Sequence, residues 1–259
     1  FPGWHIECSA MSMKYLGEEI DIHTGGIDHV KVHHTNEIAQ SEAATGKHFV
    51  RYWFHTQFLN VEGQKMSKSL GNLYTLDDLT QRGFHPLSLR YFFLGSSYRK
   101  PANFTWEALV SAQKTLVRLW EKTKELPEPS GELLKPQITL FEQAMADDLN
   151  TAKALAGMLE VADSKEATNQ IAKTLFTMDQ VMGLDLTNAQ ARLDELRSIQ
   201  IKSKENEEKA IGLATQREAL RKGKKFAEAD VLRAEILKLG FTVEDTPEGP
   251  RIKPKGPEV

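Results

Sequence analysis

Three residues near the start of the chain have side chains that suit a metal ion. His33 and Glu37 are four residues apart, so on a helix their side chains lie on one face, one turn apart. Cys8 can add a soft sulfur from a separate segment. Cysteine, histidine and glutamate together suit zinc, and three protein ligands leave a fourth position open. From spacing alone the alternative stays open, because a buried cysteine beside a helical His–Glu pair is common without any metal.

A second polar segment, residues 65–69, has the composition of a phosphate-binding loop. It reads KMSKS, so that Lys65 and Lys68 lie beside two serines, and Gly71 follows closely. Lysine carries a compact charge on a flexible stem and can follow a phosphate group that moves during a reaction. Such a charge can stabilise negative charge as it develops. A solvated turn has the same composition, so the residues alone leave both interpretations open.

The elements that would position these residues follow from the apolar pattern. Residues 19–23 predict a strand, which the sequence Thr-Gly-Gly at 24–26 interrupts. Residues 33–44 predict a helix that ends before Gly46, and residues 54–61 predict a second strand. Strand, helix and strand in this order indicate an α/β fold with parallel pairing. The lysine–serine segment comes soon after the second strand.

The rest of the chain has a mainly helical pattern. Residues 75–78 (TLDD) form a capping-box signature, and Pro86 suits the first turn of a helix over 87–94. From residue 105 onward, apolar residues recur at helical spacing. A Pro- and Gly-containing stretch at 126–131 predicts a bend or linker.

The last part of the chain predicts a helix that ends at Gly240 and then a small hairpin over residues 241–252. The net charge of the whole chain is -3, so any contact with nucleic acid must come from a local patch. One basic run near the C-terminus could contact phosphates. It consists of Arg217, Arg221, Lys222, Lys224, Lys225, Arg233 and Lys238.

Composition excludes several classes of protein. The hydrophobic fraction of 40% and the charged fraction of 27% are those of an ordinary globular protein. The single cysteine excludes an internal disulfide framework and fits a reducing compartment, and we expect the protein to be cytoplasmic. No apolar run approaches the roughly 20 residues that a membrane-spanning helix needs.

Several segments together resemble one family. Residues 65–69 resemble the KMSKS loop of class I aminoacyl-tRNA synthetases. Residues 3–11 (GWHIECSAM) and 33–40 (HHTNEIAQ) resemble, within that class, the cysteinyl-tRNA synthetases. The resemblance extends over nearly the whole chain, through residues 141–151 (FEQAMADDLNT), 225–230 (KFAEAD) and 244–247 (EDTP).

The resemblance implies a zinc site that selects the substrate. In that family two cysteines, a histidine and a glutamate hold zinc, and Cys8, His33 and Glu37 match three of these positions. By the same resemblance, the thiolate of the substrate cysteine coordinates the zinc, and Trp4 and His23 line the cysteine pocket. Zinc favours a thiolate over a hydroxyl, and so separates cysteine from serine.

The resemblance also implies an ATP site. Lys68 is the first candidate for contact with the triphosphate and Lys65 the second, and both act by positioning and by stabilising charge. Asp28 could contact the adenylate ribose or could simply form a turn. Mg²⁺ would accompany ATP, although the sequence shows no dedicated ligand cluster for it. His34 lies one residue off the ligand spacing, and we expect it to support the site without binding the metal.

The activity implied by the resemblance is that of a cysteine–tRNA ligase. L-cysteine would react with ATP to give cysteinyl-adenylate, and the cysteine would then pass to tRNA(Cys). We expect a monomer in which residues 1–104 form part of a Rossmann-like catalytic domain, 105–204 a DALR-like helical bundle that binds tRNA, and 205–259 a small α+β region that recognises the anticodon.

The family's HIGH motif and second cysteine ligand have no counterpart in this sequence. We therefore expect the chain to correspond to the C-terminal portion of such an enzyme and to be inactive by itself. Two alternatives remain open at this point. One is a zinc-dependent cysteine ligase that acts on an amino sugar in thiol biosynthesis, and the other is a module that binds zinc and tRNA without catalysis. The basic helix and the C-terminal hairpin favour the tRNA enzyme.

Overall fold

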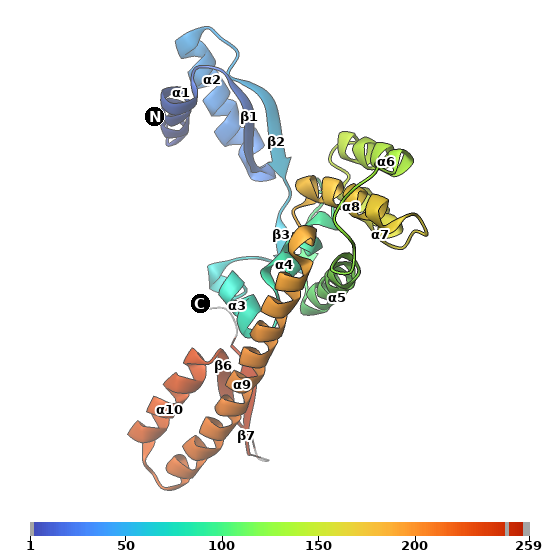
Figure 1. The fold of residues 1–259 in the computed structure, drawn as a ribbon. Coiled ribbons are helices and arrows are strands. Elements are labelled where there is room, and N and C mark those ends of the chain that lie inside the picture. The colour runs from blue at the N-terminus through green and yellow to red at the C-terminus, as the bar shows by residue number, and fades with distance from the viewer. Residues whose placement is uncertain (1–2, 247–248, 256–259) are drawn as a thin grey trace. The chain divides into compact units, whose positions relative to one another are not determined.

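The computed structural model describes residues 3–246 and 249–255. The chain divides into two compact units, each of which is described by itself. The first unit comprises residues 1–65 and 97–103, and the second comprises residues 66–96 and 104–259. Figure 1 shows the elements of both. No helix among the described residues is long and apolar enough to cross a membrane.

The first unit is built on a parallel pair of strands that two helices accompany (Figure 1). Ile20 pairs with Val50 at the start of the two strands, and both are buried with Phe49 in a small core. The prediction of parallel α/β pairing is therefore confirmed. The elements in order are α1 (His5–Leu16), β1 (Ile20–Gly26), the 3₁₀ turn η1 (Ile27–His29), the π-helical turn η2 (Val30–His34), α2 (Thr35–Thr45) and β2 (Val50–Thr56).

Strand β1 continues through the glycines that were expected to interrupt it. A Cβ atom on Gly25 would lie 2.5 Å from Cε1 of the His34 ring, and real Cβ contacts are never that short. Glycine in a strand interior often marks a close approach of another group. Here it lets the imidazole of His34 lie against the strand, so this glycine shapes the site and does not end the strand.

The second predicted strand, over residues 54–61, is two separate strands. Its first part belongs to β2, and its last part is β3 (Leu59–Val61). Strand β3 lies between β4 (Gln64–Lys65) and β5 (Ala102–Phe104) in a small sheet. The turn between β3 and β4 contains Glu62 and Gly63, which both have positive φ angles, 50° and 75°, as tight hairpin turns require.

The second unit is mainly helical, as the pattern predicts. The capping box at Thr75 is present, because its hydroxyl accepts from the Asp78 amide while the Asp78 carboxylate accepts from the Thr75 amide. Trp120 is fully buried, and its indole Nε1 donates to the Leu184 carbonyl over 2.9 Å. The helices are α3 (Leu76–Gln81), α4 (Pro86–Leu94), α5 (Trp106–Thr123), α6 (Lys135–Ala146), α7 (Thr151–Ala162), α8 (Thr168–Met182), the 3₁₀ turn η4 (Leu186–Asn188), α9 (Ala189–Lys222) and α10 (Phe226–Lys238).

The C-terminal part of this unit is a helical hairpin of α9 and α10 followed by a β-hairpin (Figure 1). Strands β6 (Phe241–Thr246) and β7 (Gly249–Pro254) pair antiparallel, which confirms the predicted hairpin; residues 247–248 lie outside the described part. Helix α9 runs without interruption through residues 204 and 205. The predicted boundary between the second and third domains therefore falls inside a helix. The division into domains of residues 1–104, 105–204 and 205–259 remains a prediction.

Candidate metal site and phosphate-binding loop

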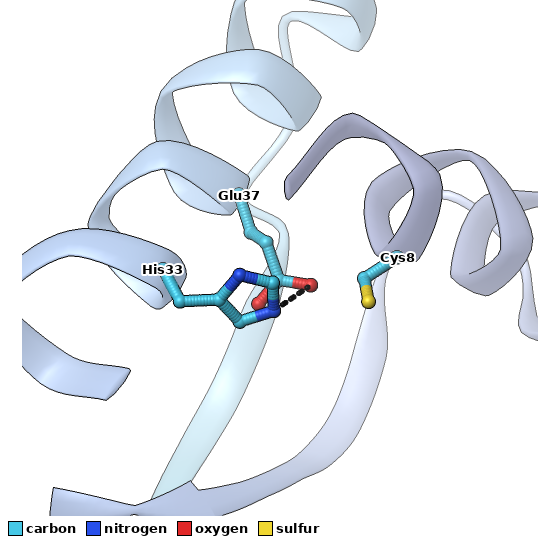
Figure 2. Close-up of side chains that lie close together, drawn as sticks. All are labelled: Cys8, His33 and Glu37. Carbon is cyan, nitrogen blue, oxygen red and sulfur yellow. Dashed lines mark ion pairs between the residues drawn. The ribbon is translucent and has the colours of Figure 1, made fainter. Parts of the chain in front are cut away.

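Cys8, His33 and Glu37 converge on one point of the first unit. Cys8 comes from α1, His33 from the π-helical turn and Glu37 from α2. One ligand atom from each lies within 4.8 Å of the others, and His33 Nε2 is 3.8 Å from Glu37 Oε1. Figure 2 shows the Cys8 sulfur and the His33 ring on either side of the Glu37 carboxylate. The predicted ligand residues therefore meet.

The π-helical turn is the local feature that brings two neighbouring histidines to this carboxylate. Both His33 and His34 are buried, and the Nε2 atom of each lies 3.8 Å from a Glu37 oxygen. Short π-helical turns inside helices are frequent at functional sites. Here the turn leads directly into α2, which carries Glu37 in its first turn.

The Glu37 side chain gives the strongest indication that a cation binds at this site. Its side chain is fully buried, and neither carboxylate oxygen has a hydrogen-bond partner. His23 Nε2 approaches Oε2 to 3.0 Å, but the angles are not those of a hydrogen bond. A buried carboxylate without partners is costly unless a cation compensates it. The donor set of sulfur, nitrogen and oxygen is one that zinc accepts, so the residues present fit this ion.

The pKa values of Cys8, His33 and His34 are shifted in the directions expected for metal ligands and their neighbours when no cation is bound. Burial raises the pKa of the Cys8 thiol, and the carboxylates of Glu37 and Glu7 raise it further. Burial lowers the pKa of His33, so its imidazole is neutral near pH 7 and can offer a lone pair. Burial and the neighbouring histidines lower the pKa of His34 to about 4. Without a metal, the thiol keeps its proton, and the His33 and His34 rings that lie beside Glu37 are neutral near pH 7.

A second set of possible ligands shares Glu37. His23, His34 and Glu37 also bring one ligand atom each within 4.8 Å of one another. His34 makes a further contact through its other ring nitrogen, Nδ1, which lies 2.7 Å from His55 Nε2. This second set lacks sulfur. We therefore regard the set with Cys8 as the better zinc site and the contacts of His23 and His34 as support for the Glu37 carboxylate.

The structure adds histidines that the sequence analysis did not assign to the site. His5 Nδ1 lies 2.7 Å from His33 Nδ1, and the ring of His29 lies 5.1 Å from that of His33. His55 contacts His34 as described above. No spacing rule connects these residues, because they come from different elements. The only signal in the sequence is the density of histidine in the first 60 residues.

The two residues expected to line a substrate pocket lie beside this cluster. The Trp4 ring stacks on the His33 ring with centroids 4.0 Å apart and an angle of 19°, and 60% of Trp4 is exposed. The His23 ring stacks on Trp53 at 4.7 Å. Trp4 thus offers an open aromatic face next to a candidate metal ligand, although its role in binding a substrate stays a prediction.

Asp28 lies in the short 3₁₀ turn after β1 and is exposed. A Cβ atom on Gly26 would lie 2.3 Å from Asp28 Oδ1, so this carboxylate bends back over the glycine. That placement suits a turn-forming aspartate, and an exposed carboxylate also leaves contact with a ribose open. The assignment of Asp28 to the ATP site stays a prediction.

The lysine–serine segment forms an exposed loop with internal hydrogen bonds. The Ser67 amide donates to Asn72 Oδ1 over 2.8 Å, and the Ser67 and Ser69 hydroxyls are 3.2 Å apart. Residues 68–70 form a 3₁₀ turn. Lys65 is exposed, and its ammonium group lies 5.8 Å from the centre of the Phe58 ring. The side chain of Lys68 lies outside the described part of the structure, so its assignment stays a prediction.

The basic run near the C-terminus is less uniform than the sequence indicates. Arg217 is buried and forms a bidentate pair with the Asp245 carboxylate, with distances of 2.6 and 3.2 Å. It is therefore part of the packing between α9 and β6, and it is not available to phosphates. Lys222 and Lys225 are exposed but lie beside Glu218 and Glu228.

The family of the chain is shown by comparison with known proteins. Residues 1–114 match the family model described as the class I (C) tRNA synthetase catalytic domain, and residues 140–187 match the DALR domain. A cysteine–tRNA ligase of Opitutus terrae is 42% identical over 98% of this chain and 52% of its own length. The corresponding ligase of Solibacter usitatus is 43% identical over 98% of this chain and 56% of its length.

The chain spans about half the length of the curated relatives that it matches. A crystal structure of a ternary complex of Agrobacterium radiobacter K84 agnB2 LeuRS with tRNA and LeuAMS superposes on 70% of this chain and 27% of that one. Its TM-score is 0.53 and its sequence identity is 15%, so this likeness concerns the fold alone. Together, the family models and the curated relatives show that the chain belongs to the cysteinyl-tRNA synthetase family of class I aminoacyl-tRNA synthetases.

Proposed function

We propose that the chain is part of a cysteine–tRNA ligase and that Cys8, His33 and Glu37 hold the zinc ion that selects the amino acid. The observation that carries this proposal is the fully buried Glu37 carboxylate, whose two oxygens have no hydrogen-bond partner although a thiol and an imidazole lie within 4.8 Å. A purely structural carboxylate at such a depth would be hydrogen-bonded.

Selection of cysteine is the chemical problem that the site would solve. Cysteine and serine differ only by sulfur against oxygen, and a pocket of ordinary contacts separates such near-isosteres weakly. When bound, zinc would supply a soft Lewis acid that prefers a thiolate to a hydroxyl. The three ligands that this chain supplies leave coordination positions of the ion open, and these could take a substrate sulfur and the second cysteine that the family resemblance implies.

The residues around the ligands have separate tasks in this proposal. His23, whose Nε2 lies 3.0 Å from Glu37 Oε2, faces one carboxylate oxygen, while the other faces His33. The exposed ring of Trp4 forms one wall of the amino-acid pocket. Both residues keep the amino acid in place, and no side-chain nucleophile is required.

The lysine–serine loop would bind the triphosphate of ATP. Lys68 is the first candidate for this contact and Lys65 the second, with Asp28 near the ribose and Mg²⁺ bound with the nucleotide. Hydrogen bonds of short polar side chains hold the loop. Such a loop can change shape as the phosphates move, which suits formation of cysteinyl-adenylate.

The remaining part of the chain would bind tRNA(Cys). Its residues 140–187 match the DALR domain, and we propose that residues 105–204 serve as the tRNA-binding bundle and residues 205–259 as the anticodon-recognition region. The exposed lysines at the end of α9 and the start of α10 suit contact with phosphates. Arg217 is excluded from that surface because it is buried against Asp245.

Calorimetric titration of the zinc-loaded chain with L-cysteine and with L-serine tests the amino-acid proposal. We expect cysteine to bind on the order of 100-fold more tightly than serine, as a discrimination by thiolate coordination requires. The preference should vanish when zinc is removed and in Glu37→Gln. The matched control Glu42→Gln alters a carboxylate five residues further along α2 and should keep the preference. Equal affinities for the two amino acids in the zinc-loaded protein would contradict the proposal.

A further inference from the structure

A junction in the second unit connects the segment that follows the lysine–serine loop with the C-terminal β-hairpin. After the loop the chain passes through Tyr74, enters α3 and leaves it at Arg82. The guanidinium of Arg82 lies 4.0 Å from the centre of the Trp106 ring and 5.4 Å from that of Tyr74. Its Nη2 atom donates to the carbonyl of Lys255, at the end of β7, over 2.7 Å.

Two further contacts join α3 to the same region. The Ser203 hydroxyl on α9 donates to the Gln81 carbonyl over 2.7 Å. Gly240, the residue before β6, has a φ of 93°, and a Cβ atom there would lie 2.6 Å from Gln81 Oε1. The Lys255 amide in turn donates to the Gly240 carbonyl over 2.7 Å. The base of the hairpin is therefore in close contact with the end of α3.

The environment of Arg82 is unusual for an arginine at a structural junction. No ion pair of Arg82 with a carboxylate exists among the described residues, and its partners are two aromatic rings and a main-chain carbonyl. A small cavity of about 240 Å³, lined in part by Arg82, Trp106 and Phe241, lies beside it. Stacking and a single directional hydrogen bond depend on precise position, unlike a screened surface ion pair.

We propose that Arg82 is a positioning residue that couples the C-terminal hairpin to the lysine–serine loop. A shift of the hairpin on binding of RNA would move the Lys255 carbonyl, and with it the Arg82 guanidinium that lies against Tyr74. Tyr74 comes two residues after Asn72, whose side chain accepts from the Ser67 amide of the loop. The coupling is reciprocal, so a ligand on the loop would change the affinity of the hairpin for RNA by the same factor.

This coupling rests on the proposed function only where it assigns triphosphate to the loop and tRNA to the hairpin. The effect of Arg82 on the lysine–serine loop can be measured without triphosphate and without tRNA. Hydrogen exchange of the chain, followed by mass spectrometry, reports the opening of individual segments. We expect Arg82→Gln to speed exchange in residues 66–75 roughly tenfold, which is the combined effect of one cation–π contact and one hydrogen bond.

Two other variants keep this test decisive. Arg82→Lys retains the charge but loses the planar group and should also speed exchange in the loop segment, so it serves if Arg82→Gln fails to fold. Arg197→Gln removes an exposed arginine of α9 whose partner is Asp194 and should leave residues 66–75 unchanged. Exchange of residues 66–75 at the wild-type rate in a folded Arg82 variant would overturn the proposal.

A second experiment adds a tRNA(Cys) transcript and separates this proposal from the proposed function. In the wild type, we expect slower exchange in residues 241–246 and 249–255 and altered exchange in residues 66–75. In Arg82→Gln the hairpin should still be protected, while the loop segment no longer responds. A loop response that persists in this variant overturns the coupling. An unprotected hairpin in the wild type contradicts tRNA binding instead, and the ligand-free comparison then still decides the role of Arg82.

Discussion

Two buried carboxylates, one in each unit, differ in what satisfies them. Asp179 in α8 accepts from the amides of Leu184 and Leu186, each over 2.7 Å, so both of its oxygens are used. Glu37 in α2 is buried more completely, yet neither of its oxygens is hydrogen-bonded. The first carboxylate closes the turn after α8. The second has no such structural task, which is why we interpret it as a ligand.

The contrast shows how burial should be used in interpreting a site. Burial alone does not separate the two residues, since a folded chain tolerates a charged group wherever hydrogen bonds compensate it. The presence of hydrogen-bond partners at Asp179 and their absence at Glu37 does separate the two residues. Arg217 is closer to Asp179 than to Glu37, because its Nη1 and Nη2 atoms both donate to the Asp245 carboxylate, although its Nε has no partner. Of these three residues, only Glu37 combines burial with unsatisfied oxygens and neighbours that can bind a metal.

The largest expected effect concerns metal affinity. Changing Cys8→Ser or Glu37→Gln should weaken zinc binding by about 100-fold or more, because each removes a ligand, and loss of a group that merely supports a ligand already costs about 10- to 100-fold. Competition with a chromophoric chelator measures this. Asp179→Asn should leave the affinity for zinc unchanged in folded protein. If Asp179→Asn weakened zinc binding as much as Glu37→Gln, the distinction between the two carboxylates would fail.

The next effect concerns the stability of the second unit. Asp179→Ala should lower the free energy of unfolding by about 3 kcal/mol, because it leaves two buried amides without an acceptor. Urea unfolding measures this loss. The control Asp194→Ala changes an exposed aspartate on α9 and should alter stability by no more than about 0.5 kcal/mol. Equal effects of the two changes would mean that the Asp179 hydrogen bonds contribute nothing specific.

In metal-free protein, Glu37→Gln should not cause the loss of stability that is expected for Asp179→Ala. The wild-type carboxylate is buried without hydrogen bonds, so a neutral amide of similar size should change the free energy of unfolding by less than about 1 kcal/mol or raise it. Urea unfolding in the presence of a chelator, followed by hydrogen exchange of residues 20–26 and 50–56 in the first unit, tests this. A loss as large as that of Asp179→Ala would assign Glu37 a structural role.

The smallest effect is a dependence of stability on pH. His85 accepts from the Leu87 amide through Nδ1, and its Nε2 lies 3.2 Å from Glu195 Oε2. Burial lowers the pKa of His85 from 6.5, although Glu195 opposes the shift. The unfolded chain therefore takes up a proton below pH 6.5 that folded His85 resists, and stability is lost as the pH falls through this range.

His85→Gln measures the contribution of this histidine. The difference in unfolding free energy between wild type and variant should be constant above pH 6.5 and should shrink below it. A difference that grows as the pH falls would show that Glu195 raises the pKa of His85 above that of the unfolded chain.

The sequence predicts the parts of this account that depend on local spacing. His33 and Glu37 are one helical turn apart, the capping box at Thr75 follows from four neighbouring residues, and the helices of the second unit follow from their apolar repeat. What the sequence leaves out depends on contacts between distant elements. The approach of His34 to Gly25 and the burial of Arg217 against Asp245 have no signature in local spacing.

Substitution of cobalt for zinc shows whether Cys8, His33 and Glu37 bind one metal ion. Cobalt bound to a thiolate gives a sulfur-to-metal charge-transfer absorption, because a coordinating thiol is deprotonated. We expect this absorption to saturate at one cobalt per chain in the wild type, to disappear in Cys8→Ser and to persist in Asp179→Asn. An absorption that Cys8→Ser leaves unchanged, or a wild-type chain that binds no cobalt, would show that these three residues do not form a metal site.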